Sequence, residues 1–295
     1  MEEQTLGGKN FLFVLISIGM RQQAIPLLRR GTSATVTMSQ YQASCLLANA
    51  FLCTFPTLLL LTNPSNHVRF PEINFYRFFE YNRICFQKLR CIFHYFERVL
   101  VKKPSGVISF SRQAVTDIPR WARSDKRLRA LHVTSRETIE DYGVGFAQVD
   151  FANACIGGGV LDLGCVQEEI RFLICPELIV SRLFTECLQE NECLIISGFE
   201  RFSYYAGYAN TFKWLAPYYD DTPRDKFHRR AVELIAIDAK YYRRFQDQFK
   251  PKWILRDLNK AYAGFFLNSE TVPAVVTGNW GCGVYHGCCQ LKSNL

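Results

Sequence analysis

The stretch GGGVLDLGCVQEE, residues 157–169, holds the residues best suited to chemistry in this chain. Three consecutive glycines carry no side chains, so the backbone there can approach a ligand closely and adopt positive φ. Successive exposed N–H groups in such a segment form a cradle for phosphate or other oxygens. Shortly afterwards, Gln167 precedes two adjacent acids, Glu168 and Glu169. A glycine triplet alone favours a flexible turn, and the neighbouring acids shift the interpretation toward a site.

The two acids fall in the first turn of a predicted helix, QEEIRFLI, residues 167–174. Adjacent helical residues point about 100° apart. We therefore expect Glu168 and Glu169 to have different roles, one at a reacting centre and the other on a neighbouring hydroxyl. The positive end of the helix favours both as carboxylates unless burial opposes it. Surface helices also begin with acids for this reason alone, so a purely structural role stays open.

Apolar and alternating runs after residue 105 predict buried strands separated by helices. The strands are expected within residues 106–114, 143–153, 192–199, 231–239 and 273–283. Helices are expected at residues 167–174, 176–188 and 253–266, with Pro176 at the first position of the second. This alternation predicts a three-layer α/β domain, in which ligands bind beyond the carboxyl ends of strands. Both glycine-rich segments fall at such ends.

The first third of the chain reads as helical. A helix is expected to begin at residues 38–40, before YQASCLLANAFLCTF, and further helical periods occur at residues 75–81 and 89–100. The breaker cluster KKPSG, residues 102–106, is the best boundary between domains. The sequence therefore predicts a helical domain over residues 1–105 and an α/β domain over residues 106–295.

Composition narrows the class of protein. Hydrophobic residues make up 48% of the chain, which fits a globular fold and not a disordered one. The net charge of +8 favours polyanionic partners, or serves solubility alone. Basic residues occur as pairs, which we interpret mostly as solvated helix faces. The pairs are Arg29-Arg30, Lys102-Lys103, Arg229-Arg230 and Arg243-Arg244.

The cysteines and the N-terminal residues indicate a reducing compartment, and the apolar runs do not indicate a membrane span. The twelve cysteines have no CxxC spacing and match no zinc motif, so we expect free thiols and no metal. The acidic start Met1-Glu2-Glu3 does not resemble a signal peptide. The apolar runs at residues 11–20 and 55–61 are too short to cross a bilayer and predict buried helix instead.

The assembled segment VDFANACIGGGVLDLGCVQEEIRF, residues 149–172, resembles the signature of poly(ADP-ribose) glycohydrolases, a glycine triplet followed by QEE. The flanks MSQYQASCLLANAFLCTFP, RVLVKKPSGVISFSRQ, LNKAYAGF and TGNWGCG are also similar, and the similarity covers residues 37–283. The resemblance implies a macrodomain-like α/β/α sandwich with a mixed sheet, preceded by an all-helical accessory domain. It implies hydrolysis of ribose–ribose O-glycosidic bonds in poly(ADP-ribose), with release of ADP-ribose.

The resemblance also implies what surrounds the reaction. No metal or other cofactor is expected. The expected partners are poly(ADP-ribose) and ADP-ribosylated proteins as substrates, with no membrane and no direct nucleic-acid binding. The expected location is nuclear or cytoplasmic.

The resemblance assigns roles to particular residues. Glu169 resembles the acid/base that protonates the leaving ribose oxygen and then activates water against an oxocarbenium-like centre. Glu168 resembles the acid that holds ribose hydroxyls, helped by Asn153. The remaining implied substrate contacts are the loop Gly157, Gly158 and Gly159, the adenine-contacting pair Ile139 and Glu140, the closing tyrosine Tyr208, the second diphosphate loop with Asn279, Gly281, Gly283 and Tyr285, and also Asp150, Phe151 and Gln167.

The chemistry agrees with this assignment. Glycosidases usually place two carboxylates about 5 Å or more apart across the scissile bond. Neighbouring acids on one helix do not suit that arrangement. One acid in two successive roles suits them better, with the phosphates of the substrate steadying the positive charge that develops.

The chain departs from the family pattern after NWGCG. The family loop continues with two glycines after its aromatic residue, whereas His286 stands at the first of these positions here. We interpret His286 as a surface histidine and not as a phosphate ligand. Family members also continue with a helix, a strand and a closing helix, so the C-terminal strand and helices are expected to be missing after Leu295. Two alternatives therefore stay open: a non-catalytic ADP-ribose-binding module, and a truncated inactive product.

Overall fold

The structure is a computed structural model that describes residues 24–56, 70–79, 83–127, 130–266 and 274–294. The predicted helix at residues 11–20, and the run at residues 55–61 from residue 57 onward, lie outside the described residues.

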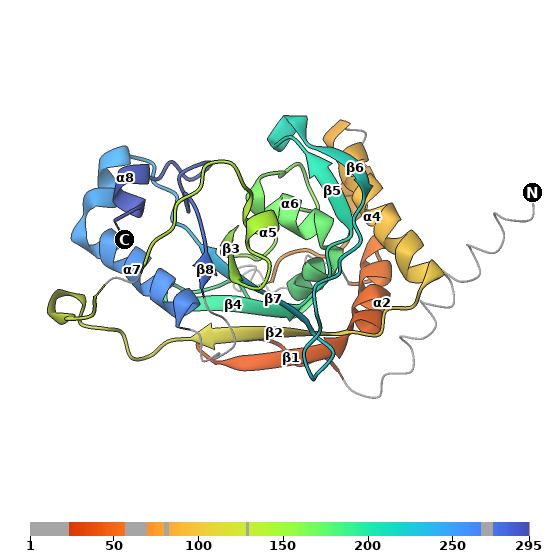
Figure 1. Cartoon of the computed structure of the whole chain (residues 1–295), viewed down its shortest axis with the longest axis horizontal. Coiled ribbons are helices and arrows are strands. Elements are labelled where there is room, and N and C mark those ends of the chain that lie inside the picture. The colour runs from red at the N-terminus through yellow and green to blue at the C-terminus, as the bar shows by residue number, and fades with distance from the viewer. Residues whose placement is uncertain (1–23, 57–69, 80–82, 128–129, 267–273, 295) are drawn as a thin grey trace, which may run out of the picture.

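A six-stranded mixed sheet forms the centre of the molecule (Figure 1). Its order is β1-β2-β4-β7-β3-β8, antiparallel from β1 to β7 and parallel from β7 to β8. The strands are β1 (Ala34–Ser39), β2 (Val107–Ala114), β3 (Ala147–Ala152), β4 (Glu192–Gly198), β7 (Arg230–Asp238) and β8 (Val275–Val276). All five predicted strands are confirmed, although β8 has only two residues at the edge.

Three strands were not predicted. β1 lies within the region that was expected to be all-helical, and it pairs with β2 along its whole length. Its β-branched residues Thr35, Val36 and Thr37 are the local signal for a strand. The other two strands, β5 (Ser203–Ala206) and β6 (Lys213–Pro217), form a separate hairpin. They are short and interrupted by a bulge, so their alternation is weak.

The predicted helices within the described residues are confirmed as helical segments, with two changes of type: the helices expected at residues 75–81 and 176–188 are 3₁₀-helices. The α-helices are α2 (Gln40–Phe51), α4 (Arg83–Val101), α5 (Ile139–Tyr142), α6 (Gln167–Ile174), α7 (Pro251–Phe265) and α8 (Cys289–Lys292). The 3₁₀-helices are η2 (Tyr76–Phe79), η3 (Trp121–Arg123), η4 (Pro176–Leu183), η5 (Ala209–Thr211) and η6 (Phe245–Phe249). Ser39 caps α2 in a capping box with Gln42, which confirms the predicted start.

The helix expected at residues 176–188 is a 3₁₀-helix that ends early. The Phe184 N–H donates to the Ser181 carbonyl three residues back, and the Ser181 hydroxyl donates to the Leu178 carbonyl. The side chain of Arg182 extends to carbonyls of other segments, described below. These competing bonds replace the regular α-helical pattern.

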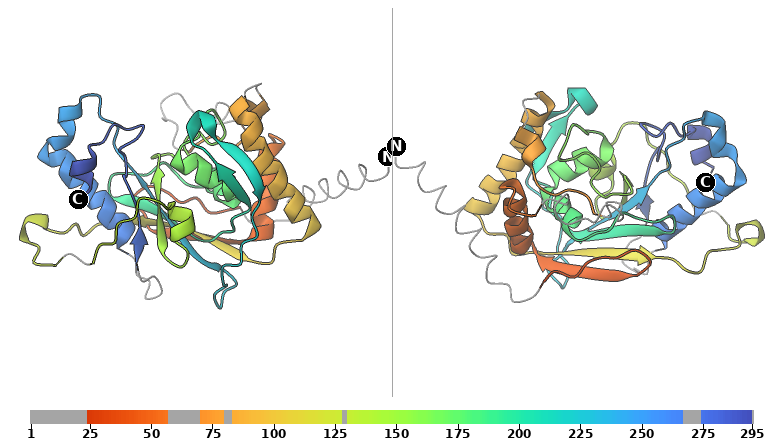
Figure 2. Two further views of the ribbon diagram at one scale, coloured as in Figure 1. Left: turned by 45° about the horizontal axis from the view of Figure 1, so that its top comes forward. Right: turned by 180° about the vertical axis from the view of Figure 1, so that it is seen from behind.

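Side chains of the central strands alternate between two apolar layers. Leu194 and Ile196 of β4 belong to the larger hydrophobic cluster, with α2, α4, α6 and η4. Cys193 and Ile235 belong to the smaller one on the opposite face, where Ala263 of α7 packs. Figures 1 and 2 show α7 on the side of the molecule opposite to α2 and α4. The predicted α/β/α sandwich with helices before it is confirmed.

A buried acid joins the N-terminal helices to this sandwich. Gln40 of α2 donates from Nε2 to both carboxyl oxygens of Glu177 at 2.9 and 3.1 Å, and the Glu200 N–H donates to Oε2 at 2.9 Å. Glu177 has no exposed surface. Burial raises the pKa of Glu177 from 4.5 to about 8, although these hydrogen bonds oppose the shift.

We expect the free energy of unfolding to show this shift as a pH dependence. Between pH 4.5 and 8 the folded chain keeps a proton on Glu177 that the unfolded chain has lost, so stability falls as pH rises across that window. One proton gives a slope of at most about 1.4 kcal/mol per pH unit. The Glu177→Gln variant lacks this contribution. In urea unfolding at pH 5, 6, 7 and 8, the free energy of unfolding of the variant should therefore increase relative to that of the wild type as pH rises. A constant difference would contradict the shift.

Candidate active site

The glycine loop follows the carboxyl end of β3 and lies against the start of α6. Gly157 and Gly158 have φ of +84° and +45°, the left-handed region that glycine favours. The Gly157 N–H donates to Glu168 Oε1 at 2.6 Å, and the Gly159 N–H donates to Glu169 Oε1 at 2.9 Å. The loop amides thus bind the two acids of α6, one each.

The surroundings of Gly158 leave no space for a side chain. A Cβ atom at Gly158 would lie 2.5 Å from Glu169 Oε1 and 2.8 Å from Glu168 Oε2. Gly164 is similarly restricted, since its Cβ would lie 2.8 Å from Glu169 Oε1. The absence of side chains therefore lets the backbone pack directly on both carboxyl groups.

The second oxygen of each acid binds a different backbone group. Glu168 Oε2 accepts from the Asn153 N–H, and Glu169 Oε2 accepts from the Val166 N–H, both at 2.8 Å. Glu169 thereby forms the acidic half of a capping box at the start of α6. The two side chains are only 3% and 6% exposed. The two acids therefore have separate sets of backbone hydrogen bonds.

A third carboxyl group lies beside this pair. Asp150 of β3 is fully buried, and neither of its oxygens accepts a hydrogen bond from the described residues. Burial, and then the charge of Glu169, raise the pKa of Asp150 well above its usual range. Burial, followed by Asp150 and Glu169, also raises the pKa of Glu168, against the two N–H donors. Burial here opposes the helix terminus and disfavours the ionised forms of Asp150 and Glu168.

Two buried cations hold the glycine loop from outside. Arg182 of η4 donates from Nη1 to the carbonyls of Ile156 and Gly158 at 2.9 and 3.0 Å. Lys88 of α4 donates from Nζ to the carbonyls of Gly159 and Val160 at 3.3 and 3.0 Å. Burial lowers the pKa of Arg182 to about 10 and also lowers the pKa of Lys88. Sequence reasoning missed both residues, although a lysine within the apolar stripe of α4 was an available signal.

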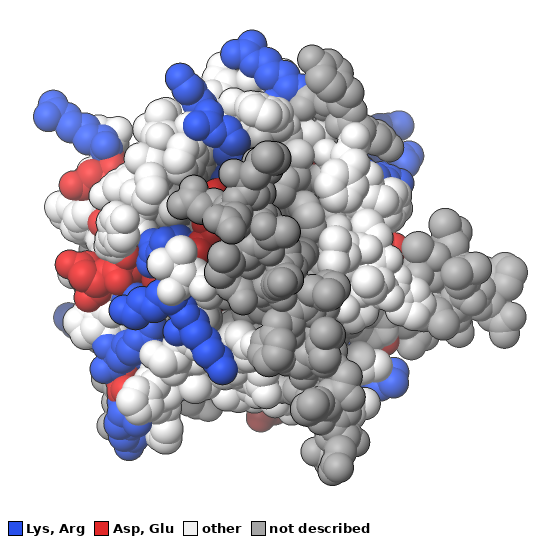
Figure 3. All heavy atoms as spheres, turned by 90° about the vertical axis from the view of Figure 1, so that its right-hand side faces the viewer, with Lys and Arg blue, Asp and Glu red and all other residues white. Residues whose placement is uncertain are grey.

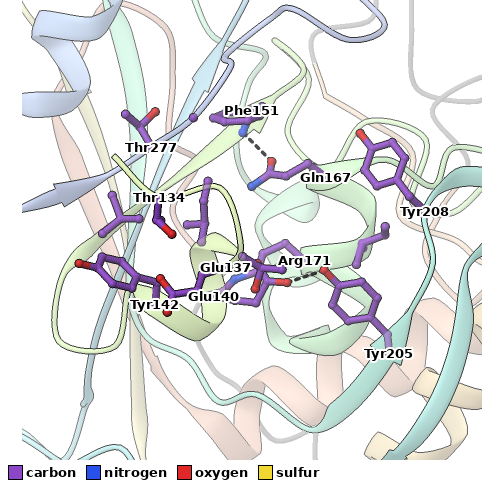
Figure 4. A pocket seen from close by; sticks show the side chains of 15 residues that line it. Thr134, Glu137, Glu140, Tyr142, Phe151, Gln167, Arg171, Tyr205, Tyr208 and Thr277 are labelled. Atoms are coloured by element: carbon purple, nitrogen blue, oxygen red, sulfur yellow. Dashed lines mark hydrogen bonds between the residues drawn. The ribbon is translucent and has the colours of Figure 1, made fainter. Parts of the chain in front are cut away.

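A cavity of about 330 Å³ opens beside α6 and the β5–β6 hairpin (Figure 4). Five predicted residues line it: Ile139, Glu140, Phe151, Gln167 and Tyr208. Gln167 Oε1 accepts from the Phe151 N–H at 2.8 Å, which ties α6 to β3. The structure thus brings together side chains from α5, β3, α6 and the segment after β5.

Further cavity residues were missed by sequence reasoning. Figure 4 shows Tyr205 and Tyr208 on one side of the cavity and Tyr142 on the other. The Tyr205 hydroxyl donates to Glu140 Oε1. Burial, and then the charge of Glu140, raise the pKa of Tyr205, so the phenol stays protonated as this donor. The remaining unpredicted lining residues are Thr134, Glu137, Thr138, Ile170, Arg171, Val276, Thr277 and Gly278.

The predicted second diphosphate loop reaches the site only in part. The Tyr285 hydroxyl accepts from Asn153 Nδ2 at 2.9 Å, beside the acids. Asn279, Gly281 and Gly283 are described, but they are not among the residues that line the cavity, where Gly278 stands instead. Gly281 packs so closely that its Cβ would lie 2.6 Å from Ala239 Cβ. Its contribution here is therefore to packing.

His286 occupies a backbone conformation that favours glycine. Its φ is +58°, and its exposed side chain contacts the ring of Tyr241 at 5.7 Å. A left-handed residue with a side chain costs about 1–2 kcal/mol. The left-handed backbone at this position explains why the family pattern has a glycine there. His286 adopts the same left-handed conformation.

The cysteines differ from prediction at one pair. Cys155 and Cys187 form a disulfide, so the prediction of free thiols is wrong for these two residues. The Leu188 N–H donates to the Ala154 carbonyl at 2.7 Å, which brings the neighbouring cysteines together. The other ten cysteines form no disulfide with a described residue.

Two further properties concern the described residues only. No cluster of three or more His, Cys, Asp or Glu side chains among them could hold a metal ion. None of the helices within the described ranges combines the length and apolar character needed to cross a bilayer.

Comparison with known proteins identifies the family. A family model described as "Poly (ADP-ribose) glycohydrolase (PARG), Macro domain fold" matches residues 118–295. The model of the helical domain of the same family matches residues 13–112. The fold is thus that of a macrodomain-type protein. The chain belongs to the poly(ADP-ribose) glycohydrolase family, as its signature predicted.

Individual relatives agree with this membership. The chain is 41% identical over 344 residues to Poly(ADP-ribose) glycohydrolase 1 of Arabidopsis thaliana. The aligned region covers 91% of this chain and 62% of that protein. It is 39% identical over 228 residues to Poly(ADP-ribose) glycohydrolase 1 of Caenorhabditis elegans, covering 71% of this chain and 29% of that protein. The chain thus spans less than two thirds of the length of these relatives.

Proposed function

We propose that this chain hydrolyses ribose–ribose O-glycosidic bonds in poly(ADP-ribose) and releases ADP-ribose. The observation that carries the proposal is the direct packing of Gly158 on the carboxyl groups of Glu168 and Glu169. This arrangement fixes both acids at the start of α6, directly after Gln167, which lines a cavity of about 330 Å³ with aromatic walls. The names of the relatives support the same activity.

Glu169 is the proposed acid/base. Its carboxylic proton passes to the ribose oxygen that leaves, the C1–O bond breaks, and an oxocarbenium-like centre forms. The resulting carboxylate then takes a proton from water, whose oxygen bonds to C1. One proton leaves Glu169 in the first step and one returns to it from water in the second.

Glu168 is the proposed ribose-holding residue. It stands beside Glu169 on α6 and is fixed by the N–H groups of Asn153 and Gly157. Asn153 thus helps through its backbone, while its side chain binds Tyr285.

The cavity is the proposed site of the nucleotide part of ADP-ribose. Ile139 and Glu140 are proposed to contact adenine, with Tyr205 fixing the Glu140 carboxylate. Tyr208 is 53% exposed at the cavity edge and is proposed to close over the ligand. An exposed aromatic ring at a polar cavity is suited to this contact.

A second function is favoured by one observation. Both oxygens of Glu169 accept backbone N–H groups, from Gly159 and Val166, as they would in a helix cap with no catalytic role. In that case the chain is a non-catalytic ADP-ribose-binding module. It would bind ADP-ribose in the same cavity without turning over the polymer.

One pair of measurements tests both functions. Purified chain is mixed with poly(ADP-ribose) and free ADP-ribose is quantified, while calorimetry measures binding of ADP-ribose alone. We expect both release and binding. Binding without release supports the module, and absence of both refutes the two functions together.

The compartment is also a proposal. The ten cysteines outside any described disulfide support a reducing location, nuclear or cytoplasmic, while the Cys155–Cys187 disulfide counts against it. Imaging of the tagged chain in cells would test this, and a secreted chain would refute it.

A further inference from the structure

A second cavity, of about 340 Å³, lies at the carboxyl end of α4. It is distinct from the cavity at α6, and the two share no lining residue. Five basic residues and two acids line it: Arg98, Lys102, Lys103, Arg224 and Arg230, with Glu200 and Asp220. The lining therefore carries an excess of positive charge.

The two acids are occupied by arginines. Glu200 pairs with Arg98 at 3.3 Å, Arg224 at 3.6 Å and Arg230 at 2.8 Å. Asp220 pairs with Arg230 at 3.5 Å. Three guanidinium groups are thus held in place around one carboxylate. Such a fixed cluster costs less ordering entropy on binding a phosphate than free side chains do.

The two lysines add charge that no described acid neutralises. Lys102 and Lys103 are exposed, and neither forms an ion pair with a described residue. Lys103 Nζ lies 4.0 Å from the centre of the Tyr41 ring. Tyr219, which is 76% exposed, lines the same cavity, with the Arg98 guanidinium 5.0 Å from its ring. A cavity lined by exposed ammonium groups and an exposed aromatic ring suits a ligand with both phosphates and bases.

The position of the cavity relates it to the active site. Lys88 of α4 supports the glycine loop, and Lys102 follows the end of the same helix. At 1.5 Å rise per residue the two positions are about 20 Å apart. Figure 3 shows Lys and Arg side chains gathered, beside fewer acids, on the side where Figure 1 places α4. A chain of several linked units can reach both places.

We propose that this cavity binds a second segment of the same poly(ADP-ribose) chain whose end lies in the active site. The proposal rests on the proposed function. Each unit of the polymer carries two phosphates and an adenine, which match the lysines and Tyr219. Binding there holds the polymer near the acids between cleavage events and lowers the KM for long chains.

Substitution of both lysines tests this site. In a Glu169→Gln background, in which turnover is expected to be slow, Lys102→Ala with Lys103→Ala should weaken binding of labelled long polymer about tenfold. The slope of log affinity against log salt should become shallower by about 1.4, since each phosphate contact on a single strand contributes about 0.7. Binding of a two-unit oligomer should not change. Lys126→Ala with Arg127→Ala removes the same charge from an exposed loop after η3 and should change neither.

Each other outcome overturns the proposal. Unchanged affinity and salt slope for long polymer refute the site. Equal weakening for the two-unit oligomer places the effect in the active site. Single-stranded DNA of equal charge that binds as tightly, with the same loss on substitution, assigns the cavity to nucleic acid. Release of ADP-ribose by the wild-type chain is measured in parallel, so failure of the proposed function is distinguished from failure of the second site.

Discussion

Replacement Glu169→Gln should lower the rate of ADP-ribose release by about 10²- to 10⁴-fold, the usual contribution of a general acid or base. The amide has no proton to give to the leaving oxygen and cannot activate water. The glutamine oxygen can still accept the Val166 N–H, as in a capping box with Gln, whereas its NH2 cannot accept the Gly159 N–H. Helix α6 should therefore persist, and binding of ADP-ribose measured by calorimetry should change little.

Two variants sharpen this result. Glu190→Gln changes an exposed acid away from the site and should leave release unchanged. Glu168→Gln should raise KM and weaken ADP-ribose binding, because the proposed role of Glu168 is to hold ribose hydroxyls. If Glu169→Gln keeps more than a tenth of the wild-type rate, Glu169 is a helix cap and another group is the acid.

The sequence predicts the centre of the sheet well because its signals are local. β4 and β7 are apolar runs bounded by charges, and their alternation fixes which residues face each layer. The hairpin β5–β6 escapes prediction because its strands are short and gain their order from packing on α4 and on each other. The type of η4 also depends on distant partners, since Arg182 bonds to carbonyls far along the chain.

The site residues also divide into those that the sequence predicts from local spacing and those that only the fold brings together. Glu168, Glu169 and the glycine triplet lie within one short segment, so their spacing alone indicates a site. Lys88 and Tyr205 come from distant elements, and only the fold brings them to the loop and the cavity. The His286 position shows the opposite case, where a departure from the family pattern keeps the backbone conformation that the glycine would supply.

The Gly158→Ala variant should lose most of its activity without losing its fold. Its φ of +45° costs an alanine about 1–2 kcal/mol. The new Cβ would overlap both Glu169 Oε1 and Glu168 Oε2, so the loop or the acids must move. Displacement of about 1 Å in a catalytic site costs on the order of 10²-fold in rate. We therefore expect release of ADP-ribose to fall at least that far, and ADP-ribose binding to weaken because Glu168 moves as well.

Gly31→Ala separates backbone strain from displacement of the acids. Gly31 has a similar positive φ of +76°, but a Cβ there would meet nothing within 4 Å. This variant should lose about 1–2 kcal/mol of unfolding free energy, measured by urea titration, and keep its full rate of release. If Gly158→Ala behaves like Gly31→Ala, with lower stability and full activity, the contact between the loop and the acids is not required for catalysis. A loss of release confined to Gly158→Ala shows instead that the bare loop holds Glu168 and Glu169 in their working positions.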